Sequence, residues 1–276
     1  MAESPKAKRQ RTGEGVVSTW PKFSERLDEE KIKELFKEKG YIRANAFISE
    51  DELGKIKKEL KRYQTDVVPD LPPKMAFYEQ KGNKDSIIRL ERMMDHDEFF
   101  KDLGQSPAFN GLADLLLEEE CLPNNVQYFS KPPGAKCTPP HQDGKYFMHG
   151  RGITFWLALD DADAENGCLY YVPQSDRKGE LEHYKTDALG FSQALTNFDD
   201  WMKETEDEMP AKKGTLLGHH PYMVHRAGEN KSKERWRPAM GLTYWAKSAV
   251  NDKEIQKKHE EYHAKLMDEL AEKGRI

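Results

Sequence analysis

The chain has 276 residues, with 44 lysine and arginine residues against 49 aspartate and glutamate residues, so its formal net charge is -5. This length suffices for a substantial hydrophobic core, and the slight acidity does not suggest a protein that binds nucleic acid or another polyanion. The three cysteines lack C-x-x-C spacing and no apolar run approaches the roughly 18 residues that span a bilayer, so we expect a soluble, cytoplasmic protein with reduced thiols and no membrane partner.

Residues 1–18 are predicted to form a disordered tail. They contain no aromatic residue and carry the basic cluster KAKRQR, so they cannot bury enough apolar surface to fold. Such a cluster also fits a nuclear-localisation signal, and nuclear import therefore stays open beside a cytoplasmic location. The rest of the chain, 19–276, is predicted to be a single domain.

Helical patterns dominate residues 19–125. A first helix is expected to end at Gly40, a residue suited to a C-cap, and Ser49 followed by Glu52 forms a capping box that opens a second helix. Three further elements are expected in this part: strands at 41–43 and 87–90, and helix over 97–120 in one or two pieces.

Residues 126–250 consist of short β-prone runs separated by Gly, Pro and Asn, which indicates a sandwich or barrel. Within them, 181–210 is an acidic insert with several aromatic residues. It is long for a connection, so we expect it to be partly helical and to serve as an active-site lid. Residues 251–276 are predicted to form a charged amphipathic helix. The fold class is therefore mainly β with flanking helices.

The C-terminal helix contains His259-Glu260-Glu261-Tyr262-His263, an H-E-x-x-H sequence typical of zinc proteases. A metzincin would continue with glycine at 266 and histidine at 269, where this chain has Leu266 and Glu269. Lysines flank the motif on both sides, as on a solvated helix face. We interpret it as a surface helix, and the zinc protease stays an alternative for which His259→Ala would abolish activity.

A second metal signature is His141-Gln142-Asp143, which follows Pro139 and Pro140. The prolines favour extended backbone, and on a strand residues i and i+2 point to the same side. On a helix the same two side chains would diverge. An imidazole and a carboxylate on one side, joined by a distant histidine, form the 2-His-1-carboxylate triad of non-haem iron(II) oxygenases.

Candidates for the distant ligand follow the predicted strand at 214–217. They are His219, His220 and His225, and two arginines come shortly after them, Arg235 and Arg237. A histidine would complete the triad, while an arginine offers a planar fork to the far carboxylate of 2-oxoglutarate. The spacing alone leaves open which histidine and which arginine act.

Several motifs in order resemble the phytanoyl-CoA dioxygenase family of iron(II)/2-oxoglutarate oxygenases, over roughly residues 36–245. They are GYIRANAFISEDEL, KPPGAKCTPPHQDGKYF, WLALDDADAENGCLYYVPQS, HRAGENKS and RWRPA. The resemblance implies a double-stranded β-helix, a jelly roll of the cupin-like kind, preceded by helices and followed by the C-terminal helix.

By position, the resemblance implies that His141, Asp143 and His225 hold the iron, with His219 or His220 as alternatives for the last ligand. It implies five residues around the cosubstrate, with Arg235 as the alternative anchor: Arg237, Gln127, Gln142, Trp156 and Arg89. The chain departs from the family pattern at two places. Asp176 stands where the family usually has histidine, and Ala227 stands where a hydroxyl residue often supports the cosubstrate carboxylate.

The implied activity is a dioxygenase that uses Fe(2+), 2-oxoglutarate and O2, with ascorbate as an optional supporting reductant, and releases succinate and CO2. Since Asp143 is present, hydroxylation or desaturation is implied rather than halogenation. The substrate would be a small organic or acyl molecule, such as an acyl-CoA or another lipid-like or polar metabolite. Four basic residues are candidates for CoA phosphates: Lys136, Lys145, Arg151 and Arg177. The two departures keep a catalytically lapsed binding or scaffold protein as the alternative, and the oligomeric state stays open.

Overall fold

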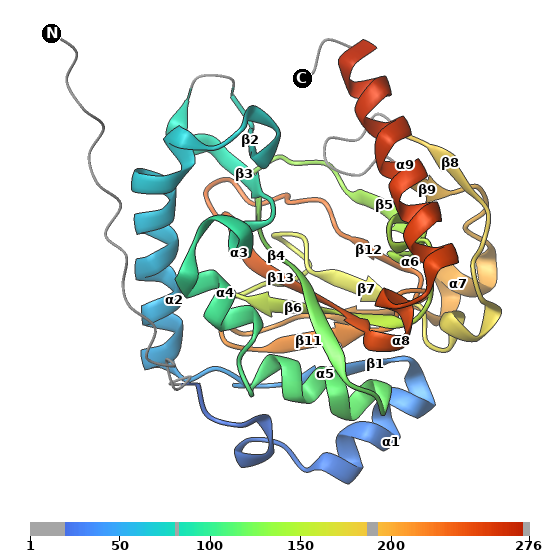
Figure 1. The fold of residues 1–276 in the computed structure, drawn as a ribbon. Helices are drawn as coiled ribbons and strands as arrows, with labels where there is room; N and C mark the ends of the chain where they lie inside the picture. Colours follow the sequence, from blue (N-terminus) through green and yellow to red (C-terminus); the bar gives the residue numbers. More distant parts are fainter. Residues whose placement is uncertain (1–19, 81–82, 187–192, 273–276) are drawn as a thin grey trace, which may run out of the picture.

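The computed structural model describes residues 20–80, 83–186 and 193–272. The predicted tail, 1–18, lies outside these ranges. The helices are α1 (Glu29–Lys39), α2 (Glu50–Arg62), α3 (Met93–His96), α4 (Glu98–Gly104), α5 (Phe109–Leu117), α6 (Gly144–Phe147), α7 (Asp200–Thr205), α8 (Lys247–Val250) and α9 (Lys253–Glu272). Figure 1 shows α2 to the left of the strands, α5 and α1 below them, and α9 at the upper right.

The ends of the first two helices follow the local sequence. Gly40 ends α1 in the left-handed conformation (φ 79°), and its N–H donates to the Phe36 carbonyl. The Ser49 side chain accepts from the backbone N–H of Glu52, whose carboxylate in turn accepts from the backbone N–H of Ser49. Both predicted boundaries are confirmed. The 97–120 region, expected to be helical in one or two pieces, forms two helices, α4 and α5.

Within the described residues, the strands form three antiparallel sheets. The large sheet has the order β1-β11-β6-β13-β4-β3-β2, and its strands are β1 (Tyr41–Ala44), β2 (Ala76–Tyr78), β3 (Ile87–Leu90), β4 (Cys121–Lys131), β6 (Gly152–Ala158), β11 (Leu216–His219) and β13 (Arg237–Ala246). The small sheet has the order β10-β7-β12-β5, and its strands are β5 (Thr138–His141), β7 (Leu169–Tyr171), β10 (Asp207–Met209) and β12 (His225–Ala227). A hairpin pairs β8 (His183–Lys185) with β9 (Gln193–Leu195).

The centre of the large sheet is buried on both faces, as β6 shows. Ile153, Phe155 and Leu157 pack with the N-terminal helices, while Trp156 and Ala158 pack with residues of the small sheet. Strands covered on both sides read as continuous apolar runs rather than alternating ones. Two facing antiparallel sheets with helices outside form a double-stranded β-helix, so the predicted fold class is confirmed.

The helical layer is tied to β13 by a buried hydrogen bond. The Tyr244 hydroxyl donates to the Gly104 carbonyl at the end of α4, over 2.8 Å. We expect Tyr244→Phe to lower the free energy of unfolding by about 1–3 kcal/mol, because the carbonyl would stay buried without its donor. Urea denaturation would measure this, with Tyr184→Phe as the control, since Tyr184 is 53% exposed. Equal midpoints for the two variants would contradict the assignment.

The described part of the 181–210 insert contains the β8-β9 hairpin, α7 and β10, so its expected helical content is confirmed. Leu195 and Met202 pack against Val172 and Val224 at the end of the small sheet. The lid role stays a prediction. Of the helices in the described ranges, none combines the length and apolar character that crossing a bilayer requires.

Candidate metal centre

Neighbouring strands of the small sheet carry two histidines face to face. His225 begins β12 and lies directly opposite His141, the last residue of β5. Asp143 is not on the strand as predicted, because the chain turns after His141 and Asp143 is the helical residue (φ -63°, ψ -29°) before α6. Even so, His141, Asp143 and His225 each offer one ligand atom, and these atoms lie within 4.8 Å of one another.

Backbone carbonyls orient both imidazoles. His141 Nδ1 lies 2.9 Å from the Pro139 carbonyl oxygen, and His225 Nδ1 lies 3.1 Å from that of Met223. Because a carbonyl can only accept, each Nδ1 carries the proton and each Nε2 keeps its lone pair. These Nε2 atoms lie 3.8 and 3.7 Å from Asp143 Oδ1.

Burial sets the protonation states of the group. It lowers the pKa of His141 to about 3 and that of His225 to about 4, so both rings are neutral near pH 7. Burial would raise the pKa of Asp143, but interactions with His225 and His219 outweigh it and leave that pKa below its usual range. Two neutral imidazoles and one carboxylate form a donor set that suits Fe(II).

The second oxygen of Asp143 is held by Thr154, which the sequence did not indicate, and by His219, which the sequence offered only as an alternative metal ligand. Thr154 Oγ1 donates to Asp143 Oδ2 over 2.6 Å, and His219 Nε2 lies 3.1 Å from the same oxygen. The Nδ1 of His219 lies 3.0 Å from the Tyr171 hydroxyl. These contacts leave Oδ1 toward the two histidines. His219 therefore lies behind the carboxylate, outside the group of three.

We expect Thr154→Val to weaken Fe(II) binding by roughly 10-fold, because residues that orient a metal ligand typically contribute that much. A fluorescent chelator competition would measure the affinity. Thr243→Val is the matched control: Thr243 lies opposite Thr154 on β13, but its hydroxyl bonds to Asn124 instead. Equal losses in both variants would show that Thr154 has no specific role.

The three residues line a cavity of about 570 Å³ between the sheets. Four of the five residues predicted around the cosubstrate also line it: Arg237, Gln127, Trp156 and Arg89. The Arg237 guanidinium carbon lies 5.2 Å from the centre of the Trp156 ring. Burial lowers the pKa of Arg237 to about 10, so it stays charged near neutral pH. Arg89 pairs with Glu91 over 2.5 Å and approaches the Gln127 side-chain oxygen at 3.4 Å.

The fifth residue, Gln142, does not line this cavity. Its side-chain amide donates to the carbonyls of Gly179 and Tyr222, and its oxygen accepts from the Leu181 N–H. The side chain is fully buried, and Gly179, Tyr222 and Leu181 all lie outside the cavity lining. Its position therefore does not support the predicted role beside the cosubstrate.

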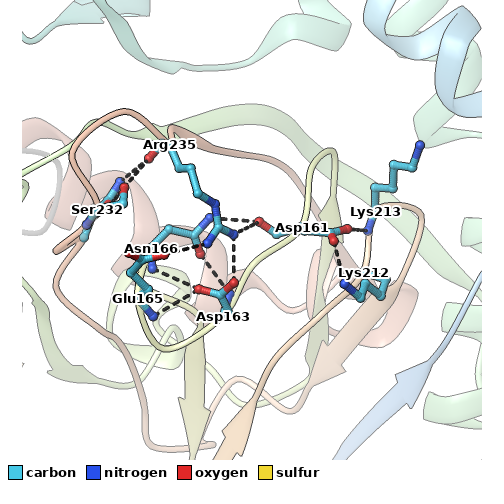
Figure 2. Close-up of polar contacts among 9 residues, drawn as sticks. Asp161, Asp163, Glu165, Asn166, Lys212, Lys213, Ser232 and Arg235 are labelled. Atoms are coloured by element: carbon cyan, nitrogen blue, oxygen red, sulfur yellow. Dashed lines mark hydrogen bonds and ion pairs between the residues drawn. The ribbon is translucent and has the colours of Figure 1, made fainter.

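The surroundings of Arg235, drawn in Figure 2, differ from those of Arg237. The Arg235 guanidinium pairs with Asp163 over 2.8 Å and with Glu165 over 2.9 Å, all on the surface. Arg235 is absent from the cavity lining, whereas Arg237 is buried and lines it. The geometry therefore favours Arg237 as the anchor.

The other residues singled out in the sequence also divide into those that line the cavity and those that do not. Ala227 lines the cavity opposite Thr138, which also lines it, while Asp176 and His220 do not. Among the four basic candidates for CoA phosphates, Lys136 alone lines the cavity. The other three bind elsewhere: Lys145 to Glu180, Arg151 to Asp252, and Arg177 to the carbonyls of Lys37 and Glu38.

The H-E-x-x-H sequence lies on α9. The His259 ring makes an edge contact with Trp245, at 5.1 Å between centres. The side chain of His263 lies outside the described residues. Among the side chains that the structure describes, only His141, Asp143 and His225 form a group that could hold a metal.

A family model for phytanoyl-CoA dioxygenase matches residues 36–239. The chain belongs to the phytanoyl-CoA dioxygenase family. It is 25% identical over 208 residues to a protein of Stutzerimonas stutzeri named a probable alpha-ketoglutarate-dependent hypophosphite dioxygenase, covering 72% of this chain and 73% of that one. It is 26% identical over 170 residues to the mouse phytanoyl-CoA dioxygenase domain-containing protein 1, where the match covers 57% of this chain and 58% of the relative.

Solved structures show the same fold at low sequence identity. The epimerase SnoN, in complex with Fe3+, alpha ketoglutarate and nogalamycin RO, gives a TM-score of 0.65 at 19% identity and covers 79% of this chain and 83% of its own. EctD from S. alaskensis, in its apoform, gives a TM-score of 0.66 at 17% identity, and the match covers 85% of this chain and 82% of EctD. The predicted membership of the phytanoyl-CoA dioxygenase family and the predicted fold are thus both confirmed.

Proposed function

We propose that the protein is an Fe(II)- and 2-oxoglutarate-dependent dioxygenase that hydroxylates a small molecule and releases succinate and CO2. The observation that carries this proposal is the convergence of His141, Asp143 and His225 in a cavity that also holds the buried, charged Arg237. We assign the iron to the first three and the far carboxylate of 2-oxoglutarate to Arg237. Residues 19–276 would act as one oxygenase domain.

The spacing along β6 supports this assignment. Asp143 is bonded to Thr154, and Arg237 lies over the ring of Trp156, two residues further along the same strand face. Two residues of a strand span about 6.6 Å. That distance is comparable to the length of an extended five-carbon dicarboxylate. One molecule of 2-oxoglutarate would therefore reach from the metal group (His141, Asp143 and His225) to the Arg237 guanidinium.

The chain's own residues would bind and orient. When bound, iron and 2-oxoglutarate would supply the oxidising chemistry with O2, in which the cosubstrate is converted to succinate and CO2. The carbonyls behind His141 and His225 turn their Nε2 atoms toward Asp143 Oδ1, where the three residues would hold the metal, and Thr154 with His219 holds Asp143. The walls of the cavity would keep bulk water from the reacting atoms.

The substrate class is left at a small molecule. An acyl-CoA receives little support, since three of the four basic residues considered for its phosphates bind elsewhere. A relative is named for hypophosphite, which keeps small polar metabolites among the candidates. The second candidate function is a lapsed oxygenase that only binds, which the departure at Ala227 would favour.

The test is an anaerobic titration of the purified protein with Fe(II) and 2-oxoglutarate, followed by visible absorption. We expect the charge-transfer band of the iron–2-oxoglutarate chelate. In air, the same sample should form succinate slowly even without substrate. Absence of the band at saturating iron and cosubstrate would favour the lapsed protein. His259→Ala should leave the charge-transfer band and succinate formation unchanged. In a zinc protease, the same substitution would abolish activity.

A further inference from the structure

Two buried cations face each other at one end of the cavity. Lys131, the last residue of β4, is the direct cross-strand partner of Arg237, the first residue of β13. The two side chains are only 7% and 4% exposed, and both line the cavity. Like charges at directly opposite positions of a sheet destabilise it, and burial removes the water that would screen them.

Among the ion pairs of the described residues, none includes Lys131 or Arg237, and the Glu229 carboxylate acts on Lys131 only from beyond ion-pair distance. Lys131 Nζ donates to the carbonyls of Lys136, over 2.7 Å, and Gly228, over 2.6 Å. An ammonium group has three donors, so one stays available. The Nε of Arg237 is buried without a hydrogen-bond partner. An anion bound between these two buried positive charges would compensate them and so stabilise the folded protein.

The backbone makes room for this lysine. Gly167 has φ 87°, and a Cβ there would lie 2.9 Å from Lys131 Cδ and 2.6 Å from the Gly228 carbonyl oxygen. The glycine lets the lysine chain cross from the large sheet to the end of β12. Its ammonium group thereby reaches the carbonyl of the residue after Ala227. The Lys131 ammonium group is thus a cationic donor at the residue next to Ala227, where the family often has a hydroxyl.

We propose that Lys131 is a second binding residue for the far carboxylate of 2-oxoglutarate and forms a two-cation seat with Arg237. This inference rests on the proposed function of the cavity. Arginine would bind the carboxylate as a planar fork, and lysine would add a point charge and one further donor. A structural alternative is that Lys131 only clamps the two carbonyls.

The experiment compares the affinities of each variant for two ligands. The ratio of the two affinities shows whether Lys131 binds the far carboxylate (the seat) or only holds the two carbonyls (the clamp). 2-Oxopentanoate has the chelating group of 2-oxoglutarate but lacks the far carboxylate. Both affinities are measured anaerobically from the charge-transfer band with Fe(II). Lys131→Gln keeps a side-chain donor for the carbonyls and removes the charge. We expect it to reduce the preference for 2-oxoglutarate by roughly 10-fold or more.

Equal weakening of both ligands in Lys131→Gln would overturn the proposal and support the clamp. Lys212→Met is the matched control for a lost lysine charge, since Lys212 is 85% exposed and pairs with Asp161 on the surface. Its ratio should match the wild-type ratio. If the wild-type protein gives no band with either ligand, the proposed function fails. If Arg237→Leu loses the preference and Lys131→Gln keeps it, this inference alone fails.

A measurement on the unaltered protein guards against a variant that does not fold. Burial, followed by the charge of Arg237, lowers the pKa of Lys131 to about 7, while Cys137 and Glu229 act in the opposite direction. Lysine is charged below its pKa. The preference for 2-oxoglutarate over 2-oxopentanoate should therefore fall as the pH rises from about 6 to about 9. A constant preference over this range would count against the seat.

Discussion

Replacing His225 with alanine should abolish the visible band of the Fe(II)–2-oxoglutarate complex and lower Fe(II) affinity by more than about 100-fold, since even residues behind a ligand contribute 10- to 100-fold. The reason is geometric. His225 Nε2 is one of the three ligand atoms that lie within 4.8 Å of one another, and its Nδ1 is already turned toward the Met223 carbonyl. Anaerobic absorption and metal analysis after desalting would measure the loss.

The control for this variant is His220→Ala. His220 is half-buried and lies five residues earlier, but its Nδ1 accepts from the Tyr222 N–H and it does not line the cavity. The band should persist in that variant. Retention of the band in His225→Ala, or its loss in both variants, would contradict the assignment of His225.

Replacing Arg237 with leucine should weaken 2-oxoglutarate binding by about 2–5 kcal/mol, roughly 30-fold or more, because a buried charge would lose its charged partner. Iron binding without cosubstrate should change little, since Arg237 is not one of the three residues that converge. Titration of the iron-loaded protein with 2-oxoglutarate, followed by the charge-transfer band, would give the affinity.

Arg235→Leu is the matched control, two residues away in the sequence. Its guanidinium pairs with Asp163 and Glu165 at the surface (Figure 2), and exposed pairs contribute at most about 1 kcal/mol to stability. The affinity for 2-oxoglutarate should stay within about 3-fold of wild type, which is less than 1 kcal/mol. A larger loss in Arg235→Leu than in Arg237→Leu would reverse the assignment of the anchor.

Local rules predicted much of the framework. Gly40 ends α1 and Ser49 with Glu52 opens α2, since caps depend on a few neighbouring residues. The convergence of His141 and Asp143 was also predicted, although the predicted backbone, a strand that continues through Asp143, was wrong. The strand ends at His141, and a helical turn brings Asp143 to the same side. That turn depends on a long-range bond, from the Gly144 N–H to the Pro221 carbonyl.

Roles that were predicted only from a residue's position beside a candidate ligand were less reliable. Gln142 lies between two candidate ligands, yet its amide binds the backbone of Gly179, Tyr222 and Leu181. Those partners are 37 to 80 residues away in the sequence. No local pattern could have indicated them.

The sequence by itself determined the family, the fold class and, through the family resemblance, three of the residues that converge in the cavity, because the order of the motifs can be read along the chain. The tertiary structure decided which arginine lines the cavity, which residues hold Asp143, and that Lys131 faces Arg237. Each of these depends on the register between strands that are distant in the chain: β13 pairs with β4 and β6, and β11 pairs with β6. A shift of one residue in any of these pairings would turn a different set of side chains toward the metal group.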